Sequence, residues 1–221
     1  MIVSYLSHKK ICLKDGINVI CTQSPIAYKD LVLGFQALND LIVCSDDEYN
    51  NKSISKSFDF VGDPLLNDNI MAKYMNVIIK NFISNLDEVN RNRILKSFYS
   101  LETVLNDSLL LEDLPLEIDF SEDIKKLLKM VNIHLDAQLM LTPYAIIETV
   151  LKIHQEYNLD SIPVFCNVAH YLDETQLKEL SKIARQLKLK IILIEFTDKQ
   201  YGVAVKDAQV AYIDRDLVDW Y

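Results

Sequence analysis

Carboxylate side chains gather in one short stretch near the middle of the chain. Six acidic residues fall within twelve positions, namely Glu112, Asp113, Glu117, Asp119, Glu122 and Asp123. Calcium takes about six to eight hard oxygen ligands, which clustered carboxylates on a loop supply well. The spacing is not that of an EF-hand loop, and Asp119 with Glu122 also fits a capping box at a helix start. The residues alone are consistent with either a calcium site or a helix cap. A calcium site would be formed by Glu117, Asp119, Glu122 and Asp123.

Lysines form a second group of residues with a possible binding role. Lys125, Lys126 and Lys129 lie opposite the apolar positions of a short predicted helix over residues 121–131. Lys52 and Lys56 occupy a polar loop before the apolar run that begins at Phe58. Lysine side chains neutralise the phosphates of nucleic acids. A row of lysines is also a common solvated surface, so the pattern alone does not assign a DNA site.

A phosphate-binding loop is missing where the order of elements would place one. An apolar strand at 17–20 leads through a loop into a helix, and strand–helix–strand returns near the C-terminus. This is the order of a P-loop ATPase head with a helical insertion, in which GxxxxGK[ST] follows the first strand. Residues 21–30 contain no glycine, and Pro25 removes an amide donor. Lys29 is followed by Asp30 instead of the Ser or Thr that would hold magnesium.

Two other positions of such an ATPase also lack the expected residues. The apolar run 162–166 is followed by Asn167 and Val168, where a catalytic head would carry Asp-Glu. The last apolar run ends at 194–197 without a sensing histidine. We therefore expect no nucleotide hydrolysis, and no enzymatic activity of the protein by itself. The alternative is that residues 17–30 are simply a strand and a turn that never bound phosphate.

Hydrophobic periodicity predicts the elements that would position these residues. Apolar residues recur every four positions over 66–82 and 94–109, which predicts two long amphipathic helices and suggests an antiparallel hairpin. Thr142-Pro143 is typical of a helix start, and Asp173 with Gln176 fits a capping box. The remaining predicted elements are strands around the turn at 15–16 and at 58–61, 162–166, 190–196, 203–205 and 210–213, and a helix over 27–39.

The fold class that follows is α/β. Continuous apolar strands alternating with helices indicate a sheet that is covered on both faces. We expect a degenerate P-loop-ATPase-like head, made of residues 1–62 together with 155–221, and a helical leg domain inserted at 63–154.

Composition excludes several classes of protein. The formal net charge of −9 argues against a diffuse nucleic-acid binder, so DNA binding would need a local basic surface. No apolar run reaches the roughly 18 residues of a membrane span, and the N-terminal charges follow the apolar residues, unlike in a signal peptide. We expect a cytoplasmic protein without a membrane partner. The four cysteines show no CxxC spacing, so no zinc site is expected.

The pattern resembles the Csn-type adaptation proteins of type II-A CRISPR systems. The resemblance extends over nearly the whole chain and rests on the order of its segments: the degenerate loop after 17–20, the helical insertion, the acidic segment 116–119, and the closing segments 163–167, 171–174 and 191–195. It implies an inactive ATPase head with helical legs, a ring-shaped homotetramer, and calcium ions that stabilise the legs. It also implies that double-stranded DNA ends enter a hole lined by lysines. Lys52 and Lys56 match the lysines of the family that precede a strand and reach this hole. The ring would act beside the integrase pair and the RNA-guided effector nuclease during spacer capture.

The function expected from these features is binding of double-stranded DNA ends without sequence preference, because no helix–turn–helix or zinc-finger pattern is present and a ring needs only backbone contacts. Bound calcium would offset the carboxylates beside Lys125, Lys126 and Lys129. One alternative is a nuclease that holds magnesium on Glu117, Asp119 and Glu122. Another alternative is a scaffold that binds only proteins. An active ATPase is the least favoured of these alternatives.

Overall fold

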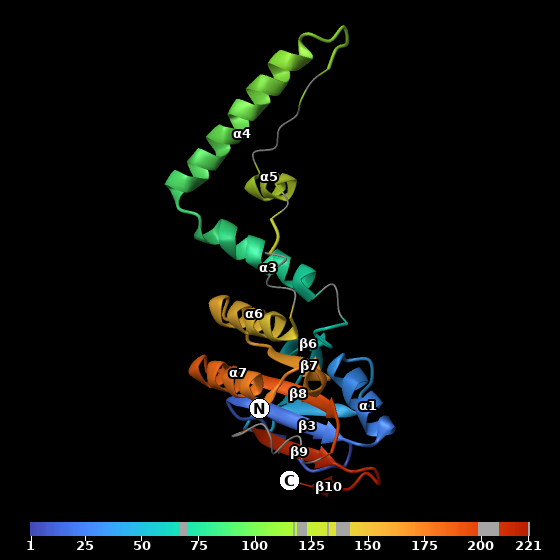
Figure 1. The fold of residues 1–221 in the computed structure, drawn as a ribbon. Helices are drawn as coiled ribbons and strands as arrows, with labels where there is room; N and C mark the ends of the chain where they lie inside the picture. The colour runs from blue at the N-terminus through green and yellow to red at the C-terminus, as the bar shows by residue number, and fades with distance from the viewer. Residues whose placement is uncertain are drawn as a thin grey trace. The chain divides into compact units, whose positions relative to one another are not determined.

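The structure is a computed structural model that describes residues 1–66, 70–116, 118, 123–131, 133–135, 142–198 and 208–220. The chain folds as two compact units. One unit, here called the head, comprises residues 1–70 and 136–221, and the other, here called the leg, comprises residues 71–135. The class is α/β with a helical insertion, as the sequence predicts (Figure 1).

A six-stranded sheet forms the centre of the head, in the order β10-β9-β3-β8-β7-β6. The five adjacent strands β9, β3, β8, β7 and β6 run parallel to one another, and β10 pairs antiparallel with β9. The strands are β3 (Gly16–Thr22), β6 (Phe58–Gly62), β7 (Ile162–Cys166), β8 (Lys190–Phe196), β9 (Gln209–Ile213) and β10 (Asp219–Trp220). The strands predicted at 58–61, 162–166, 190–196 and 210–213 are thus confirmed, and the one at 203–205 lies outside the described residues.

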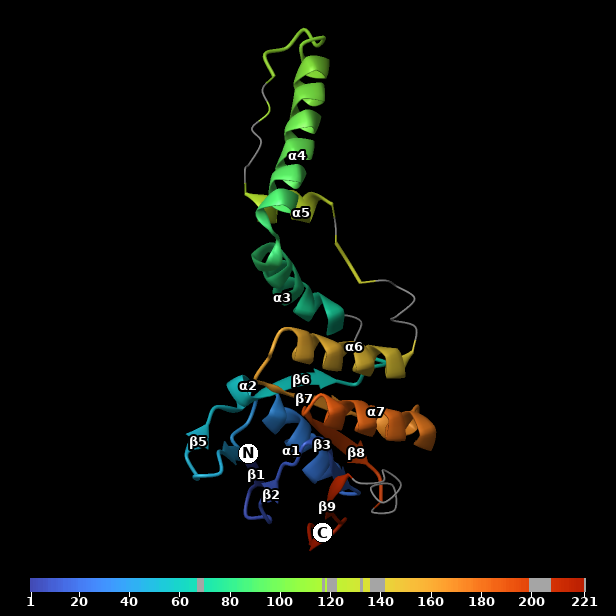
Figure 2. The ribbon, with the colours of Figure 1, turned by 90° about the vertical axis from the view of Figure 1, so that its left-hand side faces the viewer.

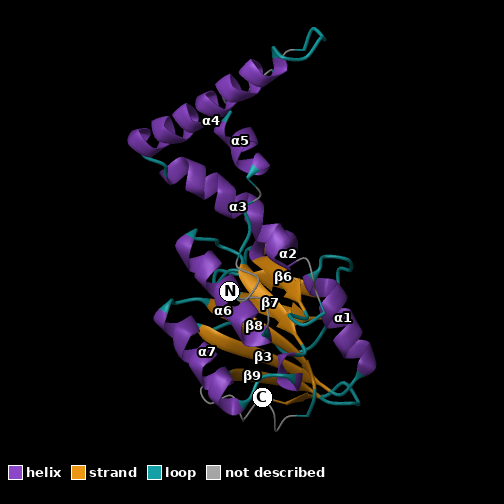
Figure 3. Cartoon of the chain, turned by 45° about the horizontal axis from the view of Figure 1, so that its top comes forward, coloured by secondary structure: helices purple, strands orange, loops and turns teal. Residues whose placement is uncertain are grey.

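Helices cover both faces of this sheet, which explains the continuous apolar strands. α1 (Pro25–Phe35) lies on one face, whereas α6 (Pro143–Glu156) and α7 (Glu174–Gln186) lie on the other (Figure 3). β3 is buried along its whole length. Residues that alternate along β8 serve opposite faces, and Ile192 and Ile194 belong to the core beneath α1.

A small antiparallel sheet in the order β2-β1-β4-β5 closes the core beside α1 (Figure 2). Its strands are β1 (Ile2–Tyr5), β2 (Ile11–Cys12), β4 (Ile42–Ser45) and β5 (Asn51–Lys52), and a short α2 (Ile54–Ser57) follows. Gly34 lets α1 approach β4 closely, because an added Cβ would lie 2.6 Å from Cγ1 of Ile42. Val3, Leu31 and Phe35 then pack in one buried cluster.

Both helix starts that the sequence identifies are confirmed. The Thr142 hydroxyl accepts a hydrogen bond from the Ala145 amide at 3.2 Å, with Pro143 as the first helical residue. Asp173 and Gln176 form the complete capping box of α7. Each cap satisfies an amide that the first helical turn leaves unpaired.

The boundary of the insertion differs from the prediction of 63–154, because α6 belongs to the head. Its apolar face is buried, and His154 Nε2 lies 2.9 Å from Asp59 Oδ2 on the adjacent strand β6. Both side chains are almost completely buried, at 0% and 8% exposure. The Thr142-Pro143 pattern gave the start of α6 correctly, but it did not show which unit the helix would pack against.

The leg contains most of α3 (Ile70–Asn85), together with α4 (Glu88–Leu109) and α5 (Ile124–Met130). The predicted antiparallel hairpin is not formed, because α3 and α4 diverge from their connection and do not lie side by side along their lengths (Figure 1). None of the residues of α4 is buried. α5 begins at Ile124, later than predicted, with Asp123 as its N-cap. Within the described ranges, no helix combines the length and apolar character needed to cross a membrane.

Replacing Asp59 by Ala should lower the free energy of unfolding by roughly 3 kcal/mol, because His154 would keep a buried polar ring without this partner. Urea denaturation of the full chain measures the effect. Lys152→Ala is the matched control, since Lys152 lies on the exposed side of the same helix in an i,i+4 pair with Glu148. A loss for Asp59→Ala as small as that for Lys152→Ala would contradict the assignment.

Candidate functional site

Polar residues meet where three adjacent parallel strands of the head end. Asp63 follows β6, Asn167 follows β7, and Glu195 is the penultimate residue of β8. The strands lie side by side in the order β8-β7-β6 and run in the same direction. In open α/β sheets, ligands bind at the carboxyl ends of the strands. We therefore treat this edge, here called the carboxyl edge, as the candidate site.

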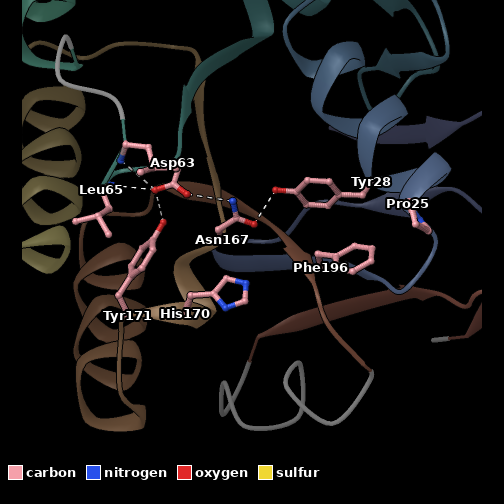
Figure 4. A pocket seen from close by; sticks show the side chains of 9 residues that line it. Pro25, Tyr28, Asp63, Leu65, Asn167, His170, Tyr171 and Phe196 are labelled. Carbon is pink, nitrogen blue, oxygen red and sulfur yellow. Dashed lines mark hydrogen bonds between the residues drawn. The ribbon is translucent and has the colours of Figure 1, made fainter.

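Asn167 connects the two sides of the carboxyl edge. Its backbone is left-handed, with φ of 61°, a conformation that Asn tolerates better than most residues. Its Nδ2 donates to Asp63 Oδ2 at 3.0 Å, and its Oδ1 accepts from the Tyr28 hydroxyl at 2.7 Å (Figure 4). These bonds place three oxygen-bearing side chains, from β6, β7 and α1, in one row.

Asp63 is held by several donors. Its Oδ1 accepts from the Leu65 amide at 2.9 Å, from the Leu66 amide at 3.3 Å and from the Tyr171 hydroxyl. Burial acts to raise the pKa of Asp63, but these hydrogen bonds together with that from Asn167 outweigh it and lower the pKa below its usual value. Asp63 is therefore an ionised carboxylate at neutral pH.

The two tyrosines of the site remain neutral. Burial raises the pKa of Tyr171, and the hydrogen bond to Asp63 raises it further. Burial also raises the pKa of Tyr28, with nearby Cys166 and Glu195 adding to the shift. Both phenols therefore keep their protons and act as neutral hydrogen-bonding groups.

An open cavity of about 630 Å³ lies over this row. It is lined by Pro25, Tyr28, Asp63, Leu65, Leu66, Asn167, His170, Tyr171 and Phe196. The rings of Tyr28 and Phe196 meet edge to face, with centroids 5.6 Å apart. The lining includes one carboxylate and no Lys or Arg, so the cavity presents negative charge and aromatic surface.

Glu195 lies beneath the site and is fully buried. Its Oε2 accepts from the Ala169 amide at 3.2 Å. Its Oε1 is buried without a hydrogen-bond partner among the described residues. Burial raises the pKa of Glu195 to about 8, although bonds from the Ala169 and Val168 amides oppose the shift. The side chain is thus protonated at neutral pH.

The segment after β3 does not form a phosphate cradle. The Ser24 side chain caps α1 by accepting from the Ala27 amide, and the Ser24 amide donates to Thr22 Oγ1 at 3.0 Å. Pro25 occupies the first helical position and has no N–H. One amide of the helix start is thus bonded within its own chain, and the first position offers none; the absence of nucleotide hydrolysis stays a prediction.

The lysines named from the sequence lie on exposed surfaces in different places. Lys52 is in β5 and forms an ion pair with Asp46 at 3.1 Å, and Lys56 is in α2, so the polar loop predicted for them is a strand and a helix. Lys125, Lys126 and Lys129 are exposed on α5, opposite the buried Ile124, Leu127 and Leu128. The predicted one-sided basic face of that helix is confirmed.

The predicted calcium ligands Glu117, Asp119 and Glu122 lie outside the described residues. Asp123 is exposed, and its Oδ1 accepts from the Lys125 amide at 2.9 Å. The part of the chain that the structure describes holds no group of three or more His, Cys, Asp or Glu side chains suited to a metal ion.

The chain is similar in fold to solved structures. The crystal structure of Stu0660 of Streptococcus thermophilus superposes with a TM-score of 0.58 over 100% of this chain and 76% of that chain, at 13% sequence identity. This likeness supports the fold, an α/β head with a helical insertion. No family model matches the sequence, and no curated protein matches it.

Sequence reasoning missed the carboxyl edge as a site. It gave Asp63 no role, considered Asn167 only as a replacement for a catalytic acid, and included Glu195 only in the last apolar run. A usable signal was present, because Asp63 and Asn167 directly follow buried parallel strands and Glu195 lies one residue before the end of the strand beside them. The contribution of Tyr28 and Tyr171 from helical and loop segments left no pattern in the sequence.

The buried Glu195 should make stability fall as pH rises. Between the ordinary pKa of 4.5 and the native value of about 8, the native protein keeps a proton that the unfolded chain releases. The Gln side chain of Glu195→Gln does not titrate, so its burial costs no stability as pH rises. The free energy of unfolding of the variant should therefore exceed that of the wild type by on the order of 3 kcal/mol at about pH 8.5 and by little at about pH 5. Urea denaturation at both pH values measures the difference. Parallel stability curves for the two proteins would refute the assignment.

Proposed function

We propose that this protein binds the ends of double-stranded DNA without sequence preference, as a calcium-stabilised homotetrameric ring that acts in CRISPR spacer acquisition and hydrolyses no nucleotide. The resemblance of the sequence to Csn-type adaptation proteins provides the biological setting. Integrase proteins and an RNA-guided effector nuclease are the proposed partners in that setting.

The basic face of α5 is the observation that carries the DNA-binding part. Lys125, Lys126 and Lys129 are exposed, whereas the apolar side of the same helix is buried. The buried side fixes which way the lysines point, so their charges are presented together. Such a face contacts phosphates and reads no bases, as expected for binding without sequence preference.

The surface of α4 supports assembly into an oligomer. This helix has 22 residues, and none of them is buried. Its exposed large hydrophobic residues are Val89, Tyr99, Leu101, Val104 and Leu105. Contiguous exposed apolar surface marks interaction sites in soluble proteins. Contacts between copies of this chain would cover it in the proposed ring.

Calcium would reduce the repulsion between DNA and an acidic chain. The proposed ligands are Glu117, Asp119, Glu122 and Asp123, whose carboxylates are the hard oxygen donors that calcium prefers. Asp123 directly precedes the basic helix α5. Calcium there would supply positive charge next to Lys125 and Lys126.

A ring that threads onto ends should retain linear duplex but not covalently closed circular duplex of the same sequence. A gel shift with calcium, repeated with a chelator, measures this. We expect retention of linear DNA with calcium and loss of at least about tenfold in affinity with chelator, because the carboxylates would again repel phosphates. Equal retention of both forms would refute threading. No retention of either would favour a scaffold that binds only proteins, and cleavage in magnesium would favour a nuclease.

Changing Lys125, Lys126 and Lys129 to Gln should weaken DNA binding by at least about tenfold. The slope of the logarithm of the binding constant against the logarithm of the salt concentration should become shallower by the amount that corresponds to about three phosphate contacts. The matched control changes Lys178, Lys182 and Arg185 to Gln, since these residues are exposed on α7 of the head. If the control variant loses as much affinity as the α5 variant, binding is a matter of net charge and the assigned face is wrong.

A further inference from the structure

The cavity at the carboxyl edge has the electrostatic character of a cation site. Asp63 is ionised and lies in the lining, whereas no Lys or Arg is among the nine lining residues. A phosphate group placed here would meet a carboxylate, with no Lys or Arg in the lining to offset the repulsion. The position that holds nucleotide phosphates in related folds is therefore suited in this chain to a ligand of the opposite charge.

The row of oxygens supplies acceptors for a donor-rich group. Asp63 Oδ2 and Asn167 Oδ1 each accept one hydrogen bond, from Asn167 Nδ2 and the Tyr28 hydroxyl respectively. Each retains a lone pair that no described bond uses. The Tyr28 oxygen donates its proton and can still accept. All three side chains line the cavity, and Figure 4 shows them in sequence from Asp63 through Asn167 to Tyr28.

A guanidinium group fits this row better than an ammonium group does. It is planar and carries five N–H donors in a fixed fork, so it can bond several acceptors that lie in a line. Aromatic rings favour its flat face, and Tyr28, Phe196 and Tyr171 all line the cavity. A single ammonium donates from one point and leaves part of the row unused.

The rim of the cavity indicates that the guanidinium belongs to a polypeptide. Leu65 and Leu66 line the cavity and are 56% and 76% exposed. Apolar side chains this exposed at the edge of a charged cavity are suited to cover the neighbouring residues of a partner chain. A free small cation would leave them in water.

We propose that the carboxyl-edge cavity of the head binds an arginine side chain of a partner protein, with its guanidinium on Asp63, Asn167 and Tyr28 and the adjoining apolar residues of the partner on Leu65 and Leu66. This inference goes beyond the proposed DNA binding and does not depend on it. It assigns to the carboxyl edge a role in recognising protein.

The probe is N-acetyl-arginine methylamide, added to the ¹⁵N-labelled full chain and followed by NMR. The arginine probe should give saturable shifts of the Asn167 side-chain amide, whereas the isosteric citrulline compound, which lacks the charge, should bind at least about tenfold more weakly. The lysine compound should also bind more weakly than the arginine compound. Equal binding of arginine and citrulline compounds, or tighter binding of inorganic phosphate, would overturn the proposal.

Two variants separate the site from general charge effects. Asp63→Asn should weaken arginine binding at least about tenfold, and Tyr28→Phe, which removes one oxygen without a charge change, should weaken it several-fold. Asp160→Asn, an exposed head residue remote from the lining, is the matched control and should bind as the wild type does. An unchanged affinity in both site variants, with melting temperatures near that of the wild type, would refute the site.

Retention of linear DNA by Asp63→Asn distinguishes this inference from the proposed function. The variant should lose arginine binding and keep DNA retention, because its substitution lies in the head and the basic face lies on α5. Loss of DNA retention together with arginine binding would show that the cavity serves the DNA and would overturn the partner assignment.

Discussion

The pairing of β3 with β8 is the constraint on which the head depends. The two strands are in parallel register over seven residues, from Gly16 opposite Lys190 to Thr22 opposite Phe196. Because helices cover both faces, nearly every side chain between the ends must be apolar or fully satisfied. Asn18 meets this condition, since its side chain bonds Lys14 and the carbonyl of Ile191.

The carboxyl edge has the backbone geometry of a ligand site and side chains that do not suit an anion. Ligands bind at the carboxyl ends of the strands in open α/β sheets, but at this edge the Ala27 amide is bonded to the Ser24 side chain and Pro25 has no amide hydrogen to offer a phosphate. The cavity lining instead holds the ionised carboxylate of Asp63, together with Asn167 and Tyr28. A cation is therefore the ligand whose charge this lining complements.

The parts of the fold that local physics determines could be predicted from the sequence. Apolar runs gave β7 and β8, and side-chain caps gave the starts of α6 and α7, because each depends on neighbours only a few residues away. Assignments that depend on distant partners failed. The face of α6 packs with the head through His154 and Asp59, which are 95 residues apart. The basic face of α5 was predictable, whereas the row from Asp63 to Tyr28 joins segments that only the sheet order brings together.

The unburied surface of α4 has a consequence for the life of the protein in a cell. A helix gains most of its stability from packing of one face, and α4 has no buried residue to provide it. In the proposed ring the missing packing would come from other copies, so the stability of the leg would rise with protomer concentration by mass action. Newly made chains at low abundance would then expose an open leg to proteases before they assemble. The amount of protein in the cell would in this way set a threshold below which no working ring accumulates.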